Sequence, residues 1–251
     1  MKTSHQWVTY FKQNLQKQRI DWSIKPTITP EECRNIIRSL QAWQLGETSD
    51  GANLIKAATQ YAKQIGDNHY LNAIRLFIQE EQKHGNNLGR YLDAIQYPRL
   101  KKDWGDSLFR RARHFNTSME LWTVTVIIVE SFAQLFYHAV SNATQCALLK
   151  QICSDILKDE APHIKFQLER LCILNLNRNT FNTRTVLQLY KLYAYVILIT
   201  VWIANARLFK AGGYSFRSLL LNINRRMHYI SYHILNEQLI QHHTNTTAIA
   251  L

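Results

Sequence analysis

Two short segments of the chain each carry a glutamate three residues ahead of a histidine. Glu81 and His84 lie in "QEEQKHG", and Glu160 and His163 lie in "KDEAPHI". The surrounding apolar spacing predicts helices, and side chains three positions apart share one helix face. One such pair can arise by chance, but a second copy is informative. The repetition favours two helices that present the same pair of potential metal ligands.

The rest of the chain also favours helices. It has only four prolines and eight glycines in 251 residues, whereas Leu, Ile, Ala, Gln, Lys and Arg are plentiful. Such a composition favours long helices over the many short strands of a sandwich or barrel. No Pro-, Gly- or Ser-rich linker divides the chain into different halves. We therefore expect an all-α protein with a single domain over residues 1–251.

Periodicity and turn signals divide this domain into three parts. Residues 1–28 hold a short lead-in helix, and residues 30–172 hold two successive helix pairs. The connection between the two pairs has the pattern of a further short helix at residues 104–115. Residues 183–240 hold two additional helices, which a Gly-Gly pair separates.

Each helix pair has a single glutamate upstream of its Glu-x-x-His motif. Partners in an antiparallel hairpin must lie equally far from the turn that joins them. Glu130 and Glu160 meet this condition, at about 21 and 24 Å along their helices. Glu47 and Glu81 match less well, at about 28 and 22 Å. On length alone, Asp50 is a rival to Glu47.

Glu130 is the most constrained of these acids, because its helix is apolar nearly all round. Its neighbours include Val126, Ile127, Val129 and Phe132. A carboxylate buried there must be paired, protonated or bound to metal, since a lone buried charge costs on the order of several kcal/mol. The alternative to a metal is a buried salt bridge to an arginine, but this helix contains no Arg or Lys.

These motifs resemble those of the ferritin-like di-iron carboxylate superfamily, in which two helices each supply one glutamate and two others each supply Glu-x-x-His. The segment "GETSDGANLIKAATQYAKQIGD", followed by "AIRLFIQEEQKH", is similar to the first hairpin of rubrerythrins. This resemblance covers residues 30–172 and favours Glu47 over Asp50. It implies a ferritin-like four-helix bundle with extra N-terminal and C-terminal helices.

The resemblance also implies roles for the acids beside the two motifs. Asp159-Glu160-x-x-His163 resembles the arrangement in ribonucleotide reductase small subunits, where the leading aspartate holds the histidine of the opposite helix. Asp159 would then orient His84. Glu80 is the corresponding acid in the first motif, with a solvated helix acid as the alternative. The expected metal ligands are Glu47, Glu81, His84, Glu130, Glu160 and His163.

Two features depart from the family pattern. Pro162 lies inside the second Glu-x-x-His motif, where it removes a backbone N–H and should kink the helix. The cysteine-pair iron module that rubrerythrins append is missing, so their route of electron delivery does not carry over, and the electron donor is unassigned.

Hard carboxylate oxygens with only two imidazoles suit iron or manganese better than zinc or copper. We expect two iron ions, with a Mn/Fe pair as the alternative, and the resemblance implies reaction with O₂. The basic charge disfavours iron storage. We therefore expect an oxygenase or oxidase that acts on a small-molecule or acyl-type substrate. The alternatives are a non-storage iron-binding, ferroxidase or peroxide-detoxifying protein, and an RNA-modifying di-iron hydroxylase.

The net charge of +12 indicates either an acidic partner or only a solubilising surface. RNA, anionic lipid and an acidic carrier protein all fit this charge, but the basic residues are scattered, which weakens the nucleic-acid case. The four cysteines have no C-x-x-C spacing and the first residues do not resemble an export signal, so we expect a cytoplasmic protein.

The longest apolar run, Leu192–Ala206, is shorter than the roughly 20 residues of a membrane-spanning helix. We expect no transmembrane segment, and we expect this run to be a buried core helix rather than a membrane-lying one. A homodimer stays open. Five aromatic residues of the C-terminal helices either wall a substrate pocket or only pack: Tyr190, Tyr193, Tyr195, Trp202 and Tyr214.

Overall fold

The computed structural model describes residues 1–103 and 118–249. Within these ranges the chain is helical and has no strand, which confirms the all-α prediction. The short helix predicted at residues 104–115 lies outside the described residues.

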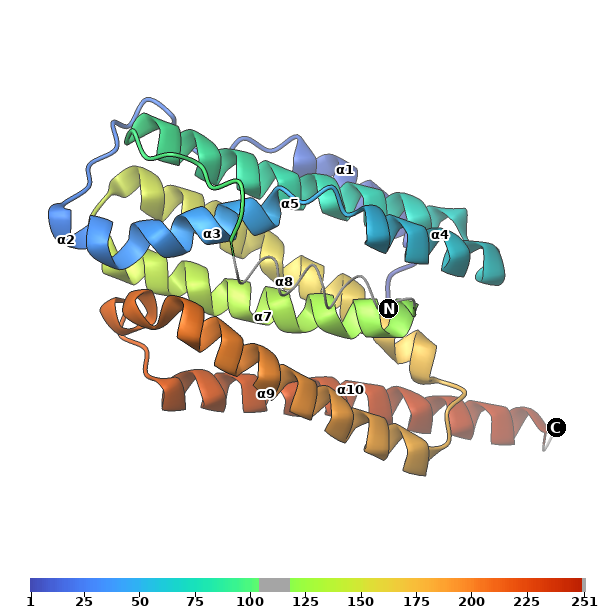
Figure 1. The fold of residues 1–251 in the computed structure, drawn as a ribbon. Helices are drawn as coiled ribbons and strands as arrows, with labels where there is room; N and C mark the ends of the chain where they lie inside the picture. The colour runs from blue at the N-terminus through green and yellow to red at the C-terminus, as the bar shows by residue number, and fades with distance from the viewer. Residues whose placement is uncertain (104–117, 250–251) are drawn as a thin grey trace.

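Figure 1 shows the helices in three layers, with α7 and α8 in the middle. One outer layer contains α1, α3, α4 and α5, and the other contains α9 and α10. The helices are α1 (Ser4–Leu15), α2 (Pro30–Glu32), a π-helix (Cys33–Ile37), α3 (Arg38–Glu47), α4 (Ala52–Ile65), α5 (Asn68–Ala94), α7 (Met119–Ala143), α8 (Ala147–Asn175), α9 (Thr180–Ala211) and α10 (Phe216–Ile249).

The first helix pair is interrupted. Thr29 caps α2: its side-chain oxygen accepts a hydrogen bond from the Glu32 N–H, and the Glu32 carboxylate accepts one from the Thr29 N–H. The π-helix then leads directly into α3. This helix ends at Glu47, and α4 starts only after Gly51. Gly51 has a φ of 63°, a left-handed conformation that glycine adopts without strain. The first helix of this pair is therefore broken between Glu47 and Ala52.

The second helix pair is continuous. Ser118 caps α7, and α8 runs as a single helix through Pro162. The turn between these helices is tied to the first pair, because Glu32 Oε1 accepts hydrogen bonds from Thr144 Oγ1 at 2.9 Å and from the Gln145 N–H at 2.6 Å. The two pairs are thereby joined at one end of the bundle.

The helices α9 and α10 cover α7 and α8 from the other side. Ala194, Ile197, Leu198 and Val201 of α9 are buried. The opposite face of α9 is exposed, so the expectation of a buried core helix is wrong for that face. Judged by length and composition alone, α7 and α9 are each apolar enough to cross a membrane, but the apolar window of α7 is 78% buried and that of α9 only 33%.

Candidate metal centre

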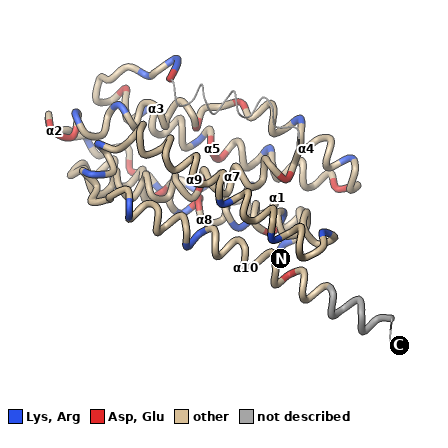
Figure 2. The backbone as a smooth tube through the Cα atoms, turned by 60° about the horizontal axis from the view of Figure 1, so that its bottom comes forward, with Lys and Arg blue, Asp and Glu red and all other residues tan. Residues whose placement is uncertain are grey.

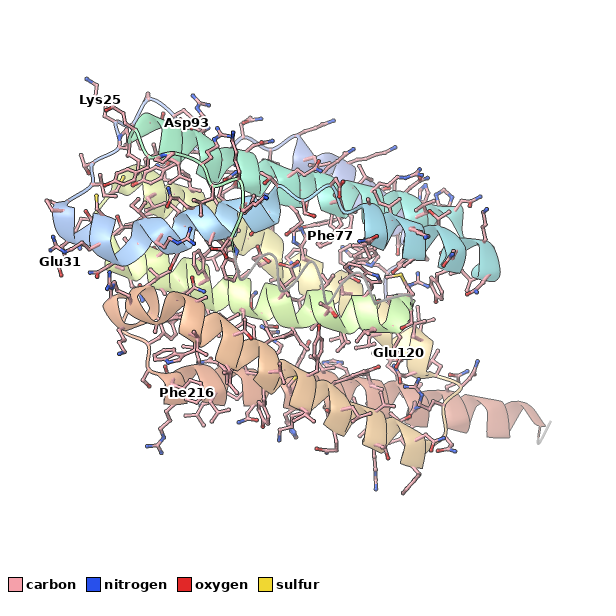
Figure 3. All side chains as sticks on the ribbon, viewed as in Figure 1. Lys25, Glu31, Phe77, Asp93, Glu120 and Phe216 are labelled. Atoms are coloured by element: carbon pink, nitrogen blue, oxygen red, sulfur yellow. The ribbon has the colours of Figure 1, made fainter. Side chains whose placement is uncertain are left out.

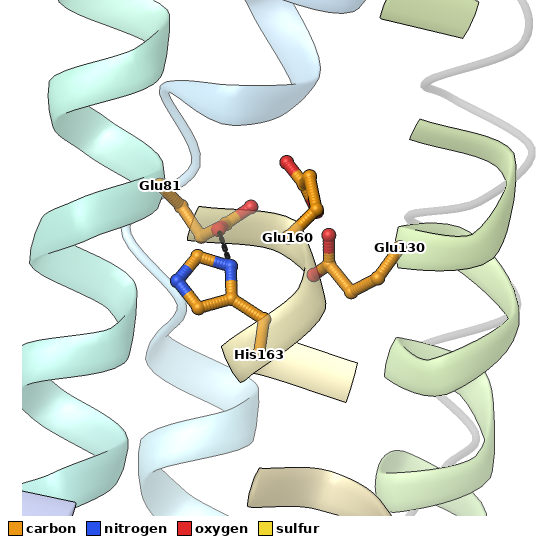
Figure 4. Close-up of side chains that lie close together, drawn as sticks. All are labelled: Glu81, Glu130, Glu160 and His163. Carbon is orange, nitrogen blue, oxygen red and sulfur yellow. Dashed lines mark ion pairs between the residues drawn. The ribbon is translucent and has the colours of Figure 1, made fainter. Parts of the chain in front are cut away.

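The bundle brings all six predicted ligands together in its interior. The atoms that could bind a metal form two groups, and within each group they lie within 4.8 Å of one another. Glu81 belongs to both groups and therefore stands between two potential cation positions. Figure 4 shows the larger group, with the side chains of α5, α7 and α8 converging. The larger group is Glu81, Glu130, Glu160 and His163, and the smaller is Glu47, Glu81 and His84.

Several potential ligand atoms in this cluster are buried without a hydrogen-bond partner. They are His84 Nδ1 and both carboxylate oxygens of Glu160. His163 Nδ1 and Glu81 Oε1 contact each other as an ion pair at 2.9 Å, and His84 Nδ1 lies 3.9 Å from Glu160 Oε1. Buried polar atoms in proteins are nearly always paired, so this concentration of facing ligand atoms needs a cause. The residues thus fit a pair of metal ions.

The outer nitrogen of each histidine contacts an acid on the opposite helix. His84 Nε2 lies 3.1 Å from Asp159 Oδ2, and His163 Nε2 lies 2.8 Å from Glu80 Oε2. These contacts leave each Nδ1 directed at the cluster, as a metal ligand requires. Glu80 is fully buried, so the solvated alternative for it is wrong.

An N-terminal asparagine bridges the two outer acids. Asn14 Nδ2 donates to Glu80 Oε1 at 2.9 Å and to Asp159 Oδ1 at 2.8 Å. Arg19 bonds to the Asn14 side-chain oxygen and also to Asp159, at 2.9 Å. The lead-in segment therefore closes one side of the site. No local motif singles out either residue, and sequence analysis missed both.

Glu47 is held in place from two helices. Its Oε1 accepts hydrogen bonds from Trp43 Nε1 at 2.9 Å and from the Tyr137 hydroxyl at 2.8 Å. Asp50, the rival by length, is exposed, and it accepts a hydrogen bond from the Ala52 N–H at the start of α4. The structure thus brings Glu47 into the cluster and leaves Asp50 outside it.

A glycine beside His84 allows the end of α3 to approach α5. A Cβ on Gly85 would lie 2.7 Å from Thr48 Cγ2 and 3.0 Å from Glu47 Cβ. The close approach therefore requires a residue without a side chain. A glycine inside a helical pattern was the available signal for this residue, and our sequence analysis did not use it.

The carboxyl groups of the cluster are buried too close together for all of them to ionise. Burial raises the pKa of Glu47 to about 8, and the Glu81 charge adds to the shift. Burial also raises the pKa of Glu130. Burial and the Glu130 charge raise the pKa of Glu160 well above its ordinary value. Among the described residues no Lys or Arg pairs with Glu130, so the arginine alternative finds no support. Bound cations would supply the missing positive charge.

The same excess of buried acids acts on the two histidines. Burial alone would lower the pKa of His84, but the hydrogen bond to Asp159 and the Glu81 charge outweigh it, so the pKa is raised. Burial also opposes the charge of His163, yet the Glu81 charge and the Glu80 hydrogen bond raise its pKa well above the usual range. Protons on the imidazoles therefore take the place that metal cations would occupy.

A cavity of about 440 Å³ adjoins the cluster, with Glu47, Glu81 and Glu130 in its wall. Apolar side chains from α5, α7 and α9 line much of the rest: Phe77, Ile78, Trp122, Val126, Val129, Phe132, Ile197 and Val201. Figure 3 shows Phe77 on the inner side of its helix.

The aromatic residues that sequence analysis offered as pocket walls are not among the described residues that line this cavity. Tyr193 bonds to Thr125, Tyr195 to Asn224 and Tyr190 to Glu120. Trp202 and Tyr214 both pack against Phe209. The packing interpretation of these aromatic residues is therefore the correct one.

The fold and the cluster together define a ferritin-like bundle with a carboxylate and histidine site. No protein-family model and no curated protein matches the sequence. Solved structures do match, among them a variant R2-like ligand-binding oxidase with an anaerobically reconstituted Mn/Fe cofactor. It has a TM-score of 0.70 and 14% identity, over 92% of this chain and 93% of that one.

The metal-free form of an R2-like ligand-binding oxidase is also similar, with a TM-score of 0.63 and 15% identity over 94% of this chain and 96% of that one. The aerobically reconstituted Mn/Fe form has a TM-score of 0.66 and 14% identity, over 92% of both chains. At such low identity the likeness shows the fold. It confirms the prediction of a ferritin-like bundle with added helices.

Proposed function

We propose that this chain is an O₂-activating oxidoreductase that holds two iron ions, or one manganese and one iron. The observation that carries the proposal is the set of buried carboxylate and imidazole atoms that face one another beside an apolar cavity, several of them without a hydrogen-bond partner. Glu47, Glu81 and His84 would hold one ion, and Glu130, Glu160 and His163 the other, with Glu81 reaching both. When bound, such a pair supplies redox chemistry that couples the reduction of O₂ to the oxidation of a substrate.

The protein's own residues orient the ligands and exclude water. Asp159 and Glu80 accept the outer N–H of the two imidazoles and so direct the inner nitrogens at the cluster, where metal would displace their protons. Tyr137 donates to Glu47 and leaves its second oxygen available. His84 of α5 and Glu160 and His163 of α8 are fully buried, which limits the access of water to these ligands.

The cavity supports an organic substrate over simple iron oxidation. Its apolar wall, next to three cluster carboxylates, suits a small apolar or acyl-type molecule whose oxidised carbon lies near Glu130. The neighbouring structures are oxidases by their names, and those with metal carry Mn/Fe. The four cysteines are free thiols, in keeping with a reducing compartment, for which we propose the cytoplasm.

The test is anaerobic loading with Fe(II), followed by exposure to O₂ with metal analysis, absorbance spectra and an oxygen electrode. We expect two irons per chain and a new visible absorption on oxidation. Glu130→Gln keeps the shape of the side chain but should lose iron. Glu120→Gln is the matched control on the same helix, because Glu120 pairs with Arg178 at 2.8 Å, outside the cluster.

The outcomes separate the alternatives. O₂ uptake that stops at the amount needed to oxidise the added iron would support a ferroxidase instead. Continued uptake with a reductant and apolar candidate substrates would support the oxidase. Equal iron content in Glu130→Gln and the unchanged protein would contradict the proposed site.

A further inference from the structure

The layer formed by α9 and α10 exposes a continuous set of large apolar side chains. We call this surface the outer face. On α9 it consists of residues that are each more than 50% exposed: Leu189, Leu192, Val196, Ile199 and Ile203. On α10 it includes Leu221, Tyr229, Tyr232 and Leu239, which are also exposed. Side chains of both helices project from the layer, away from α7 and α8 (Figure 3).

The α9 residues form a stripe and not a scatter. Their spacing alternates between three and four positions, so they lie along one side of the helix. The buried residues Ala194, Ile197, Leu198 and Val201 occupy the other side and pack inward. Isolated apolar residues on a surface need no explanation, but a contiguous face of this kind marks an interaction site.

The charges around the outer face are all positive. Arg207 and Lys210 continue the α9 stripe at its C-terminal end, and Arg217 and Arg225 are exposed on α10. The only acid in residues 180–249 is Glu237. It lies five positions from Tyr232, hence on another side of α10. Figure 2, which turns this layer forward, shows the basic residues along the two helices.

We propose that the outer face binds an anionic lipid bilayer surface, with α9 and α10 lying in the plane of the headgroups. Apolar side chains on one face, with flanking Lys and Arg, are the features by which helices bind at this interface. The outer face has no acid to pair with its basic residues, and the anionic lipid headgroups would supply that negative charge. A second copy of the chain would present the same basic residues and no acid on this face, so it would not complement the charge. The face is also two helices wide, which suits the flat surface of a bilayer.

The surface also relates to the cavity. Ile197 and Val201 line the cavity, while Val196 and Ile199 of the same helix face outward. An apolar molecule in the bilayer would thus lie one helix away from the cluster. Binding to lipid does not depend on metal, so its failure and the failure of the proposed oxidase are separate results.

The test is co-sedimentation of the full chain with vesicles of phosphatidylcholine alone and with phosphatidylglycerol added. We expect binding to the anionic vesicles, weaker binding to the neutral ones, and loss of binding in high salt. A combined Leu192→Ser and Ile199→Ser variant should bind at least about tenfold more weakly. Its control changes two exposed apolar residues elsewhere, Ile65→Ser and Leu121→Ser.

A second variant tests the charges and leaves the apolar residues of the outer face unchanged. Arg207→Glu, Lys210→Glu and Arg217→Glu together should lower binding by more than about tenfold, because each basic residue near an anionic surface contributes about fivefold. Its control, Lys12→Glu, Lys56→Glu and Lys63→Glu, makes the same change in net charge on exposed lysines outside this layer.

Circular dichroism confirms folding of each variant. Equal losses in variants and controls, or no vesicle binding by the unchanged protein, would overturn the proposal. So would a dimer in analytical ultracentrifugation that the Leu192 and Ile199 variant abolishes while vesicles stay unbound, because the occupant would then be a second copy.

Discussion

Glu130 and Glu47 occupy equivalent places in the two helix pairs, but the helix that carries Glu130 is continuous and the helix that carries Glu47 is broken. Glu130 lies in the middle of α7, which continues for more than a dozen residues beyond it. Glu47 is the last residue of α3, and four residues follow before α4 begins. The partner helices α5 and α8 are both unbroken, so the difference is confined to one of the four helices that carry the cluster.

The break changes what lies beside the ligands. The segment from Ser49 to Leu54 lines the cavity together with Glu47 and Glu81, whereas Glu130 is the one potential ligand of the second pair in the cavity wall. Glu81 of the first pair has 17% of its side chain exposed, and Glu160 of the second pair has none. The second pair thus keeps Glu160 and His163 away from the cavity, and the first pair places two of its three potential ligands, Glu47 and Glu81, next to room for a substrate.

The largest expected effect is a difference between Glu81→Gln and Glu47→Gln. Glu81 belongs to both groups of potential ligand atoms, so its loss should weaken binding of both ions by more than about 100-fold, beyond the effect of losing an outer hydrogen bond. Glu47 belongs only to the smaller group, so one ion should remain. Iron per chain after anaerobic loading and desalting measures this. One retained ion in both variants would contradict the position of Glu81 between the two ions.

Asn14→Ala should have the next largest effect. Asn14 joins Glu80 to Asp159 and so couples the histidine supports of both pairs. Removing it should lower metal affinity by about 10–100-fold for both ions, as losing such outer contacts does. Competition with a chelator gives the affinities, and the exposed Asn86→Ala is the control. An effect on one ion alone would show that the bridge is not shared.

Gly85→Ala tests the contact that the broken helix makes. The added Cβ would meet Thr48 and Glu47, so we expect a loss of about 1–3 kcal/mol in the free energy of unfolding of the apo protein. Gly46→Ala is the control, because its Cβ would meet nothing within 4 Å and the change should stay within about 1 kcal/mol. Urea unfolding measures both. Equal midpoints would mean that the approach of α3 is not tight.

The smallest effect concerns the pH dependence of the apo protein. The pKa of Glu47 rises from 4.5 to about 8 on folding, and that of His84 is also raised. The folded state then holds more protons than the unfolded state above pH 4.5, so stability falls as pH rises toward 8. Each such group contributes at most about 1.4 kcal/mol per pH unit. Thermal unfolding from pH 5 to 8 should show this loss, and a Glu47→Gln variant should show less of it.

Much of the second pair could be predicted from local pattern. A carboxylate inside an apolar helix, and a Glu-x-x-His at matching distance from the turn, fix both helices and their faces. In the first pair, equal helix lengths favoured Asp50, because a count along the chain assumes an unbroken helix. The resemblance to rubrerythrins favoured Glu47, and the break after it explains why the count misled.

Other features could not be read locally. Asn14 contacts acids 66 and 145 residues away, and such contacts leave no periodic signal. The run Leu192–Ala206 is apolar on both sides, so periodicity could not show that one side is exposed. The role of the six side chains as metal ligands stays a prediction.

The most direct test of the central claim is X-ray absorption of the protein loaded anaerobically with iron. Two irons bridged by shared carboxylates should give a metal–metal vector of about 3.5–4 Å, as in other two-metal sites. The first shell should contain oxygen and imidazole nitrogen. A single isolated iron, or iron with no metal neighbour at that distance, would contradict the account.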